Sequence, residues 1–331
     1  MDPDVGRRKC LAVLGATILW PLAARAQPAE RVRRVGVLIY GRADNRGSRA
    51  QADSLREGMQ ELGWFEGRNL KIELRYNSDR ERIRTAAEEL LRTAPDVVVA
   101  NTNAATAALQ GLTRTIPIVF AGVGDPVAAG LITSLNRPGG NVTGITNLFF
   151  SLGGKWLELL KEIAPRLARV AILYNADLSA RGDWFAAIEE AAPMFDVTLT
   201  KLPIRNLADI ESGIEQFAAE PNRALIIVPP GLVGTDRDLT LRLVRDRRLP
   251  AIYYARTYSI DGGLMSYGAD SADLFRQSAN YVDRILRGAK PGELPVQFPN
   301  KFELVINRGT AKSMGLDIPP MLIARADEVI D

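Results

Sequence analysis

Residues 115–146, TIPIVFAGVGDPVAAGLITSLNRPGGNVTGIT, decide the fold of this chain. A continuous apolar run, Ile116 to Ala121, is bounded by turn residues and predicts a strand buried on both faces. The glycine-rich loop after it ends at Asp125-Pro126, which suits the N-cap and first position of a helix that we expect to reach about Leu135. Val142 to Thr146 then predicts another strand. In open parallel α/β sheets, ligands bind at such a loop at the carboxyl end of a strand.

Strands and helices alternate along most of the chain. Apolar or alternating segments predict three strands, each followed by a helix, between residues 35 and 112. The same order recurs about 130 positions further on, where Val170 to Tyr174 matches Val35 to Tyr40 and Pro250 matches Pro117. Regular alternation of this kind predicts parallel sheets with helices on both faces. We therefore expect an α/β protein of two lobes, each a doubly wound parallel sheet.

The C-terminal part of the chain does not begin a third lobe. A helix is predicted from Asp273 to Leu286 and an alternating strand from Phe302 to Asn307. The tail from Pro319 onward is expected to pack on the surface. Because both lobes are already complete, these elements should serve as hinge strands and edge additions.

The N-terminus has the pattern of an export signal. Arg7-Arg8-Lys9 is followed by an apolar run from Cys10 to Leu22 and by a small-x-small cleavage site, Ala24-Arg25-Ala26. The Arg7-Arg8 pair with Leu11 also fits twin-arginine export. A short membrane anchor is the alternative, but the apolar run is short for a bilayer. We expect residues 1–26 to be a cleaved signal peptide and the protein to be periplasmic.

The composition excludes several classes of function. The 331 residues include 42 Lys and Arg against 39 Asp and Glu, and cleavage removes four of the former and two of the latter, leaving 38 against 37. This balance gives no reason to expect nucleic acid. The chain has no histidine, and its one cysteine, Cys10, lies in the signal, so Ser-His-Asp, Cys-His and ordinary zinc sites are excluded from the mature chain. Gly122 and Gly124 complete neither a dinucleotide fingerprint nor a P-loop, and no cofactor or metal is expected.

Candidate ligand-binding residues lie where the predicted strands end. Thr102 and Asn103, with exposed backbone N–H groups, suit a carboxylate, whereas Asp125 or Asp177 suits an ammonium group. Arg256 could bind a carboxylate with both of its terminal nitrogens. Each residue also has a purely structural role open to it, as a helix cap, a solvated cation or a packing residue. The full set is Tyr40, Gly41, Thr102, Asn103, Gly124 and Asp125 in the first lobe, Phe149 after the crossover, and Asn175, Asp177, Pro230, Tyr254 and Arg256 in the second lobe.

Four segments carry a resemblance to a known family. They are Ile116 to Phe120, Gly124 to Leu131 (GDPVAAGL), Arg137 to Gly144 (RPGGNVTG) and Phe302 to Asn307. From Val35 to its C-terminus the chain resembles the ABC transporter substrate-binding protein family that includes tryptophan/tyrosine-type uptake proteins. The resemblance implies a type I periplasmic-binding-protein fold with a three-strand hinge, and a ligand trapped when the lobes close. It also implies a membrane permease, driven by an ATPase, as partner.

We accordingly expect a monomeric periplasmic solute-binding protein without catalysis. Its ligand would be a small carboxylate, with an aromatic or other apolar amino acid favoured. The first lobe should contain residues 27–146 and about 268–295, and the second residues 147–267 and about 296–331. Two alternatives stay open: an exported sensing module that signals to a membrane receptor, and an enzyme that uses carboxylate or lysine chemistry.

Overall fold

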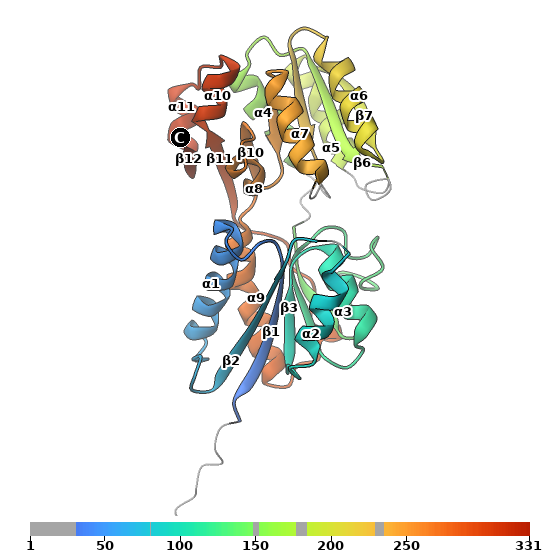
Figure 1. Cartoon of the computed structure of the whole chain (residues 1–331), viewed down its shortest axis with the longest axis vertical. Helices are drawn as coiled ribbons and strands as arrows, with labels where there is room; N and C mark the ends of the chain where they lie inside the picture. Colours follow the sequence, from blue (N-terminus) through green and yellow to red (C-terminus); the bar gives the residue numbers. More distant parts are fainter. Residues whose placement is uncertain (1–30, 80, 148–151, 177–183, 229–234) are drawn as a thin grey trace, which may run out of the picture. The chain divides into compact units, whose positions relative to one another are not determined.

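Two separate β-sheets organise the chain (Figure 1). The computed structural model describes residues 31–331 except residues 80, 148–151, 177–183 and 229–234. By its internal contacts, the chain from Val32 to Asp331 forms one unit. The predicted signal peptide lies outside the described residues.

The first sheet contains five parallel strands in the order β2-β1-β3-β4-β5. Every residue of β3, Val97–Ala100, is buried, as expected for a central strand whose side chains are all apolar. Gly144 of β5 crosses so close to Phe120 that a Cβ there would lie 2.1 Å from the Phe120 carbonyl oxygen, and its φ is +151°. Only glycine fits this position. The other strands are β1 (Arg33–Tyr40), β2 (Leu70–Asn77), β4 (Ile118–Val123) and β5 (Val142–Thr146).

Helices cover both faces of the first sheet, and together they form what we call the first lobe. On one face Leu55 and Met59 of α1 share a core with Phe275 of α9. On the other face Leu90 of α2 and Leu109 of α3 pack against the strands. Because α9 follows β10 in the chain, the first lobe is completed by a C-terminal segment (Figure 1). The helices are α1 (Arg46–Glu61), α2 (Ile83–Leu91), α3 (Asn103–Leu112) and α9 (Ser271–Leu286).

The second sheet, with its helices, forms the second lobe. Its order is β12-β11-β10-β9-β8-β6-β7, and β11 runs antiparallel to β10. One continuous apolar core, with the buried Trp156 among its largest side chains, fills this lobe. The strands are β6 (Arg169–Asn175), β7 (Thr198–Ile204), β8 (Arg223–Ile227), β9 (Ala251–Tyr253), β10 (Met265–Ala269), β11 (Phe302–Asn307) and β12 (Glu328–Ile330). The helices are α4 (Leu152–Ile163), α5 (Trp184–Ala191), η1 (Ala192–Phe195), α6 (Leu207–Ala218), α7 (Thr235–Asp246), α8 (Arg256–Ile260), α10 (Arg308–Met314) and α11 (Pro320–Arg325).

The two sheets repeat one strand order. The order β2-β1-β3-β4-β5 of the first sheet corresponds to β7-β6-β8-β9-β10 of the second. This is the doubly wound order in which ligands bind at the carboxyl edge. The predicted α/β architecture of two parallel-sheet lobes is thus confirmed. The second sheet differs from the first in carrying β11 and β12 beyond the repeat.

The chain passes between the sheets at three places. The first follows β5, the second lies between β10 and α9, and the third leads into β11. Before the third passage comes the short 3₁₀ helix η2, Pro291–Glu293, and Gln297, which forms a bridge with Ile145 of β5. These passages agree with the expected hinge strands.

The helix predicted from Asp125 to about Leu135 is wrong. The chain forms successive turns there instead. Gly130 has a φ of +69°, which interrupts a right-handed helix. The Thr133 hydroxyl donates to the Arg137 carbonyl at 2.9 Å, a local bond that competes with helical hydrogen bonds.

The C-terminal tail does more than pack on the surface. Leu322 of α11 is fully buried, and β12 extends the second sheet by pairing in parallel with β11, with Val329 opposite Ile306. The tail therefore places the Glu328 side chain at an edge of the second lobe.

Candidate functional site

Two asparagines tie together the loops at the carboxyl ends of β1, β3 and β4. The Tyr40 N–H donates to Asn101 Oδ1 at 2.6 Å, and the Gly124 N–H donates to Asn103 Oδ1 at 2.9 Å. Because these three strands are neighbours in the sheet, their loops form one continuous edge. Gly41 belongs to the same edge: its N–H donates to the Asn77 carbonyl at 3.0 Å. The structure thus brings the predicted first-lobe residues together.

Thr102 holds an uncommon backbone conformation at this edge. Its φ is +63° and its ψ is 151°, a region that β-branched residues rarely occupy. Its hydroxyl accepts from the Ala105 N–H at 3.4 Å, so it caps α3. Strain of this kind costs about 1–3 kcal/mol and concentrates at functional sites. The start of α3 directly follows β3, so it lies at the edge where β1, β3 and β4 end.

Asp125 acts as a cap for the turns that follow it. Its Oδ1 accepts from the Val127 N–H at 3.0 Å and from the Ala128 N–H at 2.9 Å. Both bonds use the same oxygen, which leaves Oδ2 free of the capping interaction. The neighbouring Gly124 carbonyl accepts from the Thr146 hydroxyl at 3.0 Å, which fixes the loop against β5.

Asn147 is a polar residue of this region that sequence reasoning missed. It follows β5, and its N–H donates to the Val123 carbonyl at 2.9 Å. Its buried Oδ1 receives no hydrogen bond from any residue that the structure describes. Asn101, directly after β3, was not among the predicted site residues either. In both cases the available signal was a short polar side chain directly after a buried strand, the same signal that selected Asn103.

The second lobe contributes fewer described residues. Tyr254 follows β9, is partly buried, and lies 5.6 Å from the Tyr258 ring, centroid to centroid, at a tilt of 59°. The backbone of Asn175 ends β6, but its side chain, like Phe149, Asp177 and Pro230, lies outside the described residues. For those four residues the predictions stay predictions.

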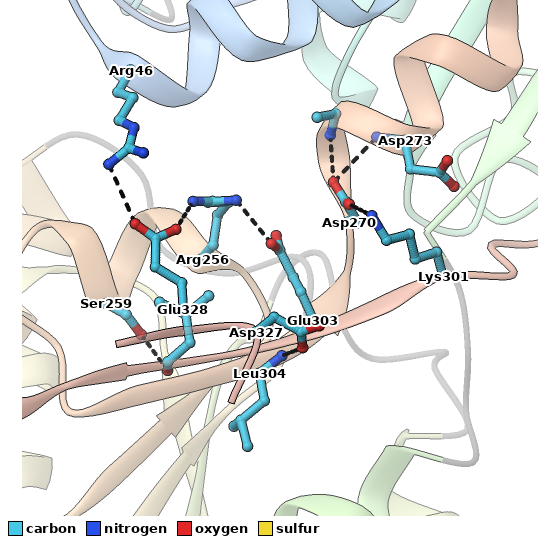
Figure 2. Close-up of polar contacts among 12 residues, drawn as sticks. Arg46, Arg256, Ser259, Asp270, Asp273, Lys301, Glu303, Leu304, Asp327 and Glu328 are labelled. Carbon is cyan, nitrogen blue, oxygen red and sulfur yellow. Dashed lines mark hydrogen bonds and ion pairs between the residues drawn. The ribbon is translucent and has the colours of Figure 1, made fainter. Parts of the chain in front are cut away.

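Arg256, at the start of α8, is held by carboxylates of the protein itself (Figure 2). Its Nη1 donates to Glu303 Oε2 at 2.8 Å, and its Nη2 donates to Glu328 Oε2. Glu303 comes from β11 and Glu328 from β12, so three elements far apart in the sequence meet here. A ligand carboxylate would have to compete with both glutamates for this guanidinium.

Glu303 is the most unusual ionisable group of this cluster. The residue is 6% exposed, and its Oε1 atom has no hydrogen-bond partner among the described residues. Burial raises the pKa of Glu303 to about 7, although Arg256 opposes the shift. The carboxylates of Asp270, Asp327 and Glu328 add to the increase.

The carboxyl edges of the two sheets come into contact at α1 and α8. α1 follows β1 and α8 follows β9, and Arg46 Nη1 of α1 lies 3.3 Å from Glu328 Oε1 (Figure 2). A Cβ at Gly47 would lie 3.8 Å from the Thr257 Cγ2 atom. These contacts bring residues near the predicted first-lobe and second-lobe sites together.

Two surface cavities are lined by none of the predicted site residues. One of about 160 Å³ is lined by α1 and α9, including Glu61 and Arg276, and another of about 360 Å³ is lined by residues around α10 and α11, including Lys312 and Leu316. Across the residues that the structure describes, acidic side chains form no cluster able to hold a metal ion. Among these same residues, every helix is too short or too polar to cross a bilayer.

Comparisons with known proteins identify relatives over most of the chain. The family model described as ABC transporter substrate binding protein matches residues 37–330. A tyrosine-binding protein of Clostridioides difficile (strain R20291) is 23% identical over 261 residues, which cover 78% of this chain and 75% of that protein.

Solved structures with the same fold cover nearly the whole described chain. A conserved domain protein from Vibrio cholerae is 28% identical with a TM-score of 0.74, covering 90% of this chain and 100% of its own. An ABC domain from Streptococcus pneumoniae in complex with L-Trp is 23% identical with a TM-score of 0.74, covering 90% of this chain and 99% of its own.

Proposed function

Because the chain belongs to the ABC transporter substrate-binding protein family, we propose that it captures an amino acid and delivers it to the permease of an ABC importer. An aromatic or other apolar side chain is the favoured ligand type, and a relative named for tyrosine binding and a neighbour that holds L-Trp support this choice. The observation that carries the proposal is the polar edge formed by Thr102, Asn103 and Gly124, which lies at the carboxyl ends of adjacent strands.

The ligand carboxylate would bind at the start of α3. The first N–H groups of a helix have no partners inside it, and the helix dipole favours negative charge there. Thr102 and Asn103 frame this point, and Asn103 Oδ1 holds the Gly124 loop in place. A carboxylate bound there gains hydrogen bonds without a dedicated arginine. This agrees with Arg256 being engaged by Glu303 and Glu328.

The ammonium group would lie near Asp125, whose Oδ2 is not used in capping. Tyr40 and Tyr254 would contact the apolar part of the ligand, one from each lobe. A ligand that contacts both lobes favours the arrangement in which the lobes are closed on it, so capture is a shift in population. No step of this function requires a catalytic group, a cofactor or a metal.

We also propose that the protein acts outside the cytoplasm as a monomer. Members of this family are typically exported, and residues 1–26 have the sequence of a cleaved signal. The alternative partner is a membrane receptor in place of a permease. In that case the same closing motion would signal to the receptor that ligand is bound.

Thermal denaturation with a ligand panel tests this function. The panel contains L-tryptophan, L-tyrosine and L-phenylalanine, with indole-3-propionate and tryptamine as probes that lack the ammonium or the carboxylate. A ligand at 100 times its Kd should stabilise the protein by about 2.7 kcal/mol, which raises Tm by several degrees. Absence of any shift in folded protein would overturn the proposed ligand class.

A pair of asparagine variants tests the site. Asn103→Ala should weaken binding about 5- to 30-fold, because losing one hydrogen bond that orders the site costs about 1–2 kcal/mol. Asn69→Ala is the matched control: Asn69 Oδ1 likewise accepts from a backbone N–H, that of Phe65 at 2.8 Å, but at the amino edge of the same sheet. Equal affinities for the two variants, measured by calorimetry, would refute the assignment of the site to the carboxyl edge.

A further inference from the structure

Four charged side chains form a continuous chain of ion pairs between the two lobes, which we call the ionic relay (Figure 2). Arg46 Nη1 of α1 lies 3.3 Å from Glu328 Oε1 of β12. The other Glu328 oxygen accepts from Arg256 of α8, whose Nη1 donates to Glu303 Oε2 at 2.8 Å. Glu328 is therefore shared by one arginine from each lobe, and its two oxygens serve different partners.

Exposure falls steadily along the relay. The Arg46 side chain is 80% exposed, Glu328 27%, Arg256 20% and Glu303 8%. The outer pair is therefore weak and reversible, as exposed ion pairs generally are. The inner pair is removed from water, where an unbalanced charge has a much larger effect. A change at the buried end can consequently decide whether the exposed pair forms.

The buried end of the relay is incompletely satisfied. Glu303 Oε1 and Arg256 Nε are both buried, and in the part of the chain that the structure describes neither has a hydrogen-bond partner. A single guanidinium thus serves two carboxylates, each through one oxygen. Removing the charge of Glu303 would leave Arg256 free to turn toward Glu328 alone.

The other charged groups around Glu303 are already engaged. Lys301, on the same segment, pairs with Asp270, which caps α9 at the passage between the lobes. Asp327, beside β12, accepts from the Leu304 N–H at 2.7 Å. Facing Glu303 from β10 is Gly268, which has no charge. Arg256 is therefore the cation that responds when Glu303 gains or loses a proton.

We infer that the ionic relay is a proton-sensitive latch, in which ionised Glu303 shares Arg256 and leaves Glu328 able to hold Arg46, whereas protonated Glu303 releases Arg256 to Glu328 and frees Arg46. The coupling is reciprocal. When Arg46 leaves, the negative charge of Glu328 acts more strongly on Glu303 and favours its proton. Acidification therefore weakens the link between the lobes. The relation of the latch to ligand capture rests on the proposed function, but the latch itself does not.

The composition of the chain makes the titration of Glu303 easy to distinguish from that of other groups. The chain contains no histidine, so no imidazole titrates near neutral pH. Burial raises the pKa of Glu303 to about 7, in a pH range in which no histidine titrates. A pH-dependent change in lobe separation between pH 5.5 and 8.5 can thus be traced to the relay with variants of single residues.

Energy transfer between two dyes measures the latch without ligand. In a Cys10→Ser background, Arg114→Cys and Met194→Cys place one dye on each lobe at exposed positions remote from the relay. Transfer between the dyes should change as pH falls from 8.5 to 5.5, with a midpoint near 7. Arg46→Gln and Glu303→Gln should each show the low-pH transfer at every pH.

The control is Arg42→Gln, which removes an equally exposed arginine of the first lobe whose partner, Asp44, lies in the same lobe. This variant should respond to pH as the parent chain does. A parent chain with no pH response, or an Arg46→Gln variant that keeps the response, would overturn the latch. Circular dichroism confirms that each variant is folded. Because no ligand is present, failure of this test leaves the proposed function standing, and failure of the ligand panel leaves this test intact.

Discussion

Glu303→Gln should make the protein more stable above neutral pH. The pKa of Glu303 is raised from 4.5 to about 7, chiefly by burial. A carboxyl group whose pKa is raised by folding loses stability as pH increases from its unfolded pKa to its folded pKa. The difference between these two pKa values corresponds to about 3 kcal/mol of unfolding free energy. Glutamine keeps the shape and a hydrogen-bond acceptor for Arg256 but has no charge, so this loss should disappear.

Urea unfolding between pH 5 and 8.5 measures this effect. The free energies of unfolding of parent and variant should nearly coincide at pH 5 and should differ by about 3 kcal/mol above pH 7.5, with the variant more stable. Glu293→Gln is the control, because the Glu293 side chain is 71% exposed on the surface of η2. Its unfolding free energy should follow that of the parent chain at every pH.

A loss of stability in the variant that stays constant or grows as pH rises would refute the reasoning. Such a result would mean that the bond from Arg256 to Glu303 outweighs the burial of the carboxylate. It would also place the folded pKa of Glu303 at or below its ordinary value. The absence of histidine keeps the comparison simple, because few other groups change protonation in this range.

Two further substitutions test the framework of the site and of the hinge. Gly144→Ala should cost more than about 4 kcal/mol, because the added Cβ would lie 2.1 Å from the Phe120 carbonyl oxygen at a backbone conformation suited to glycine; a Tm within a few degrees of the parent would contradict this. Asp270→Asn should cost about 1–2 kcal/mol at pH 7 and less at pH 3. Burial alone would raise the pKa of Asp270, but Lys301 and two backbone N–H groups lower it, so its contribution is present above the unfolded pKa and is lost as pH falls. Equal losses in urea unfolding at both pH values would speak against this account.

Most of the fold could be predicted from the sequence, because buried strands appear in it as short apolar runs. Val142–Thr146 and Phe302–Asn307 were predicted with the bounds that the structure has. The repeat of strand order was visible for the same reason. The prediction of a helix after Asp125 was wrong because a good helix start signal was given more weight than Gly130 and the hydroxyl-rich segment that follows it. Local start signals do not decide whether a helix can continue.

The site was predictable only where contacts are local. Thr102 and Asp125 were recognised as caps because a cap and its helix are neighbours in the sequence. The partners of Arg256 were not, since Glu303 lies 47 positions away and Glu328 lies 72 positions away. Neither glutamate stands in a pattern that marks it as buried or paired. Asn147 was missed because a lone asparagine after a strand reads as an ordinary turn residue.

The position of β12 after all the other described strands in chain order has a consequence for biosynthesis. Glu328 is made after the strands of both sheets up to β11. The lobes can therefore gain their cores before the ion pairs that link them exist. A nascent chain in which β12 has not yet been made would hold both cores and still lack the ion pairs of Glu328. The three residues of β12 would accordingly matter more for the connection between the lobes than their small contribution to the core suggests.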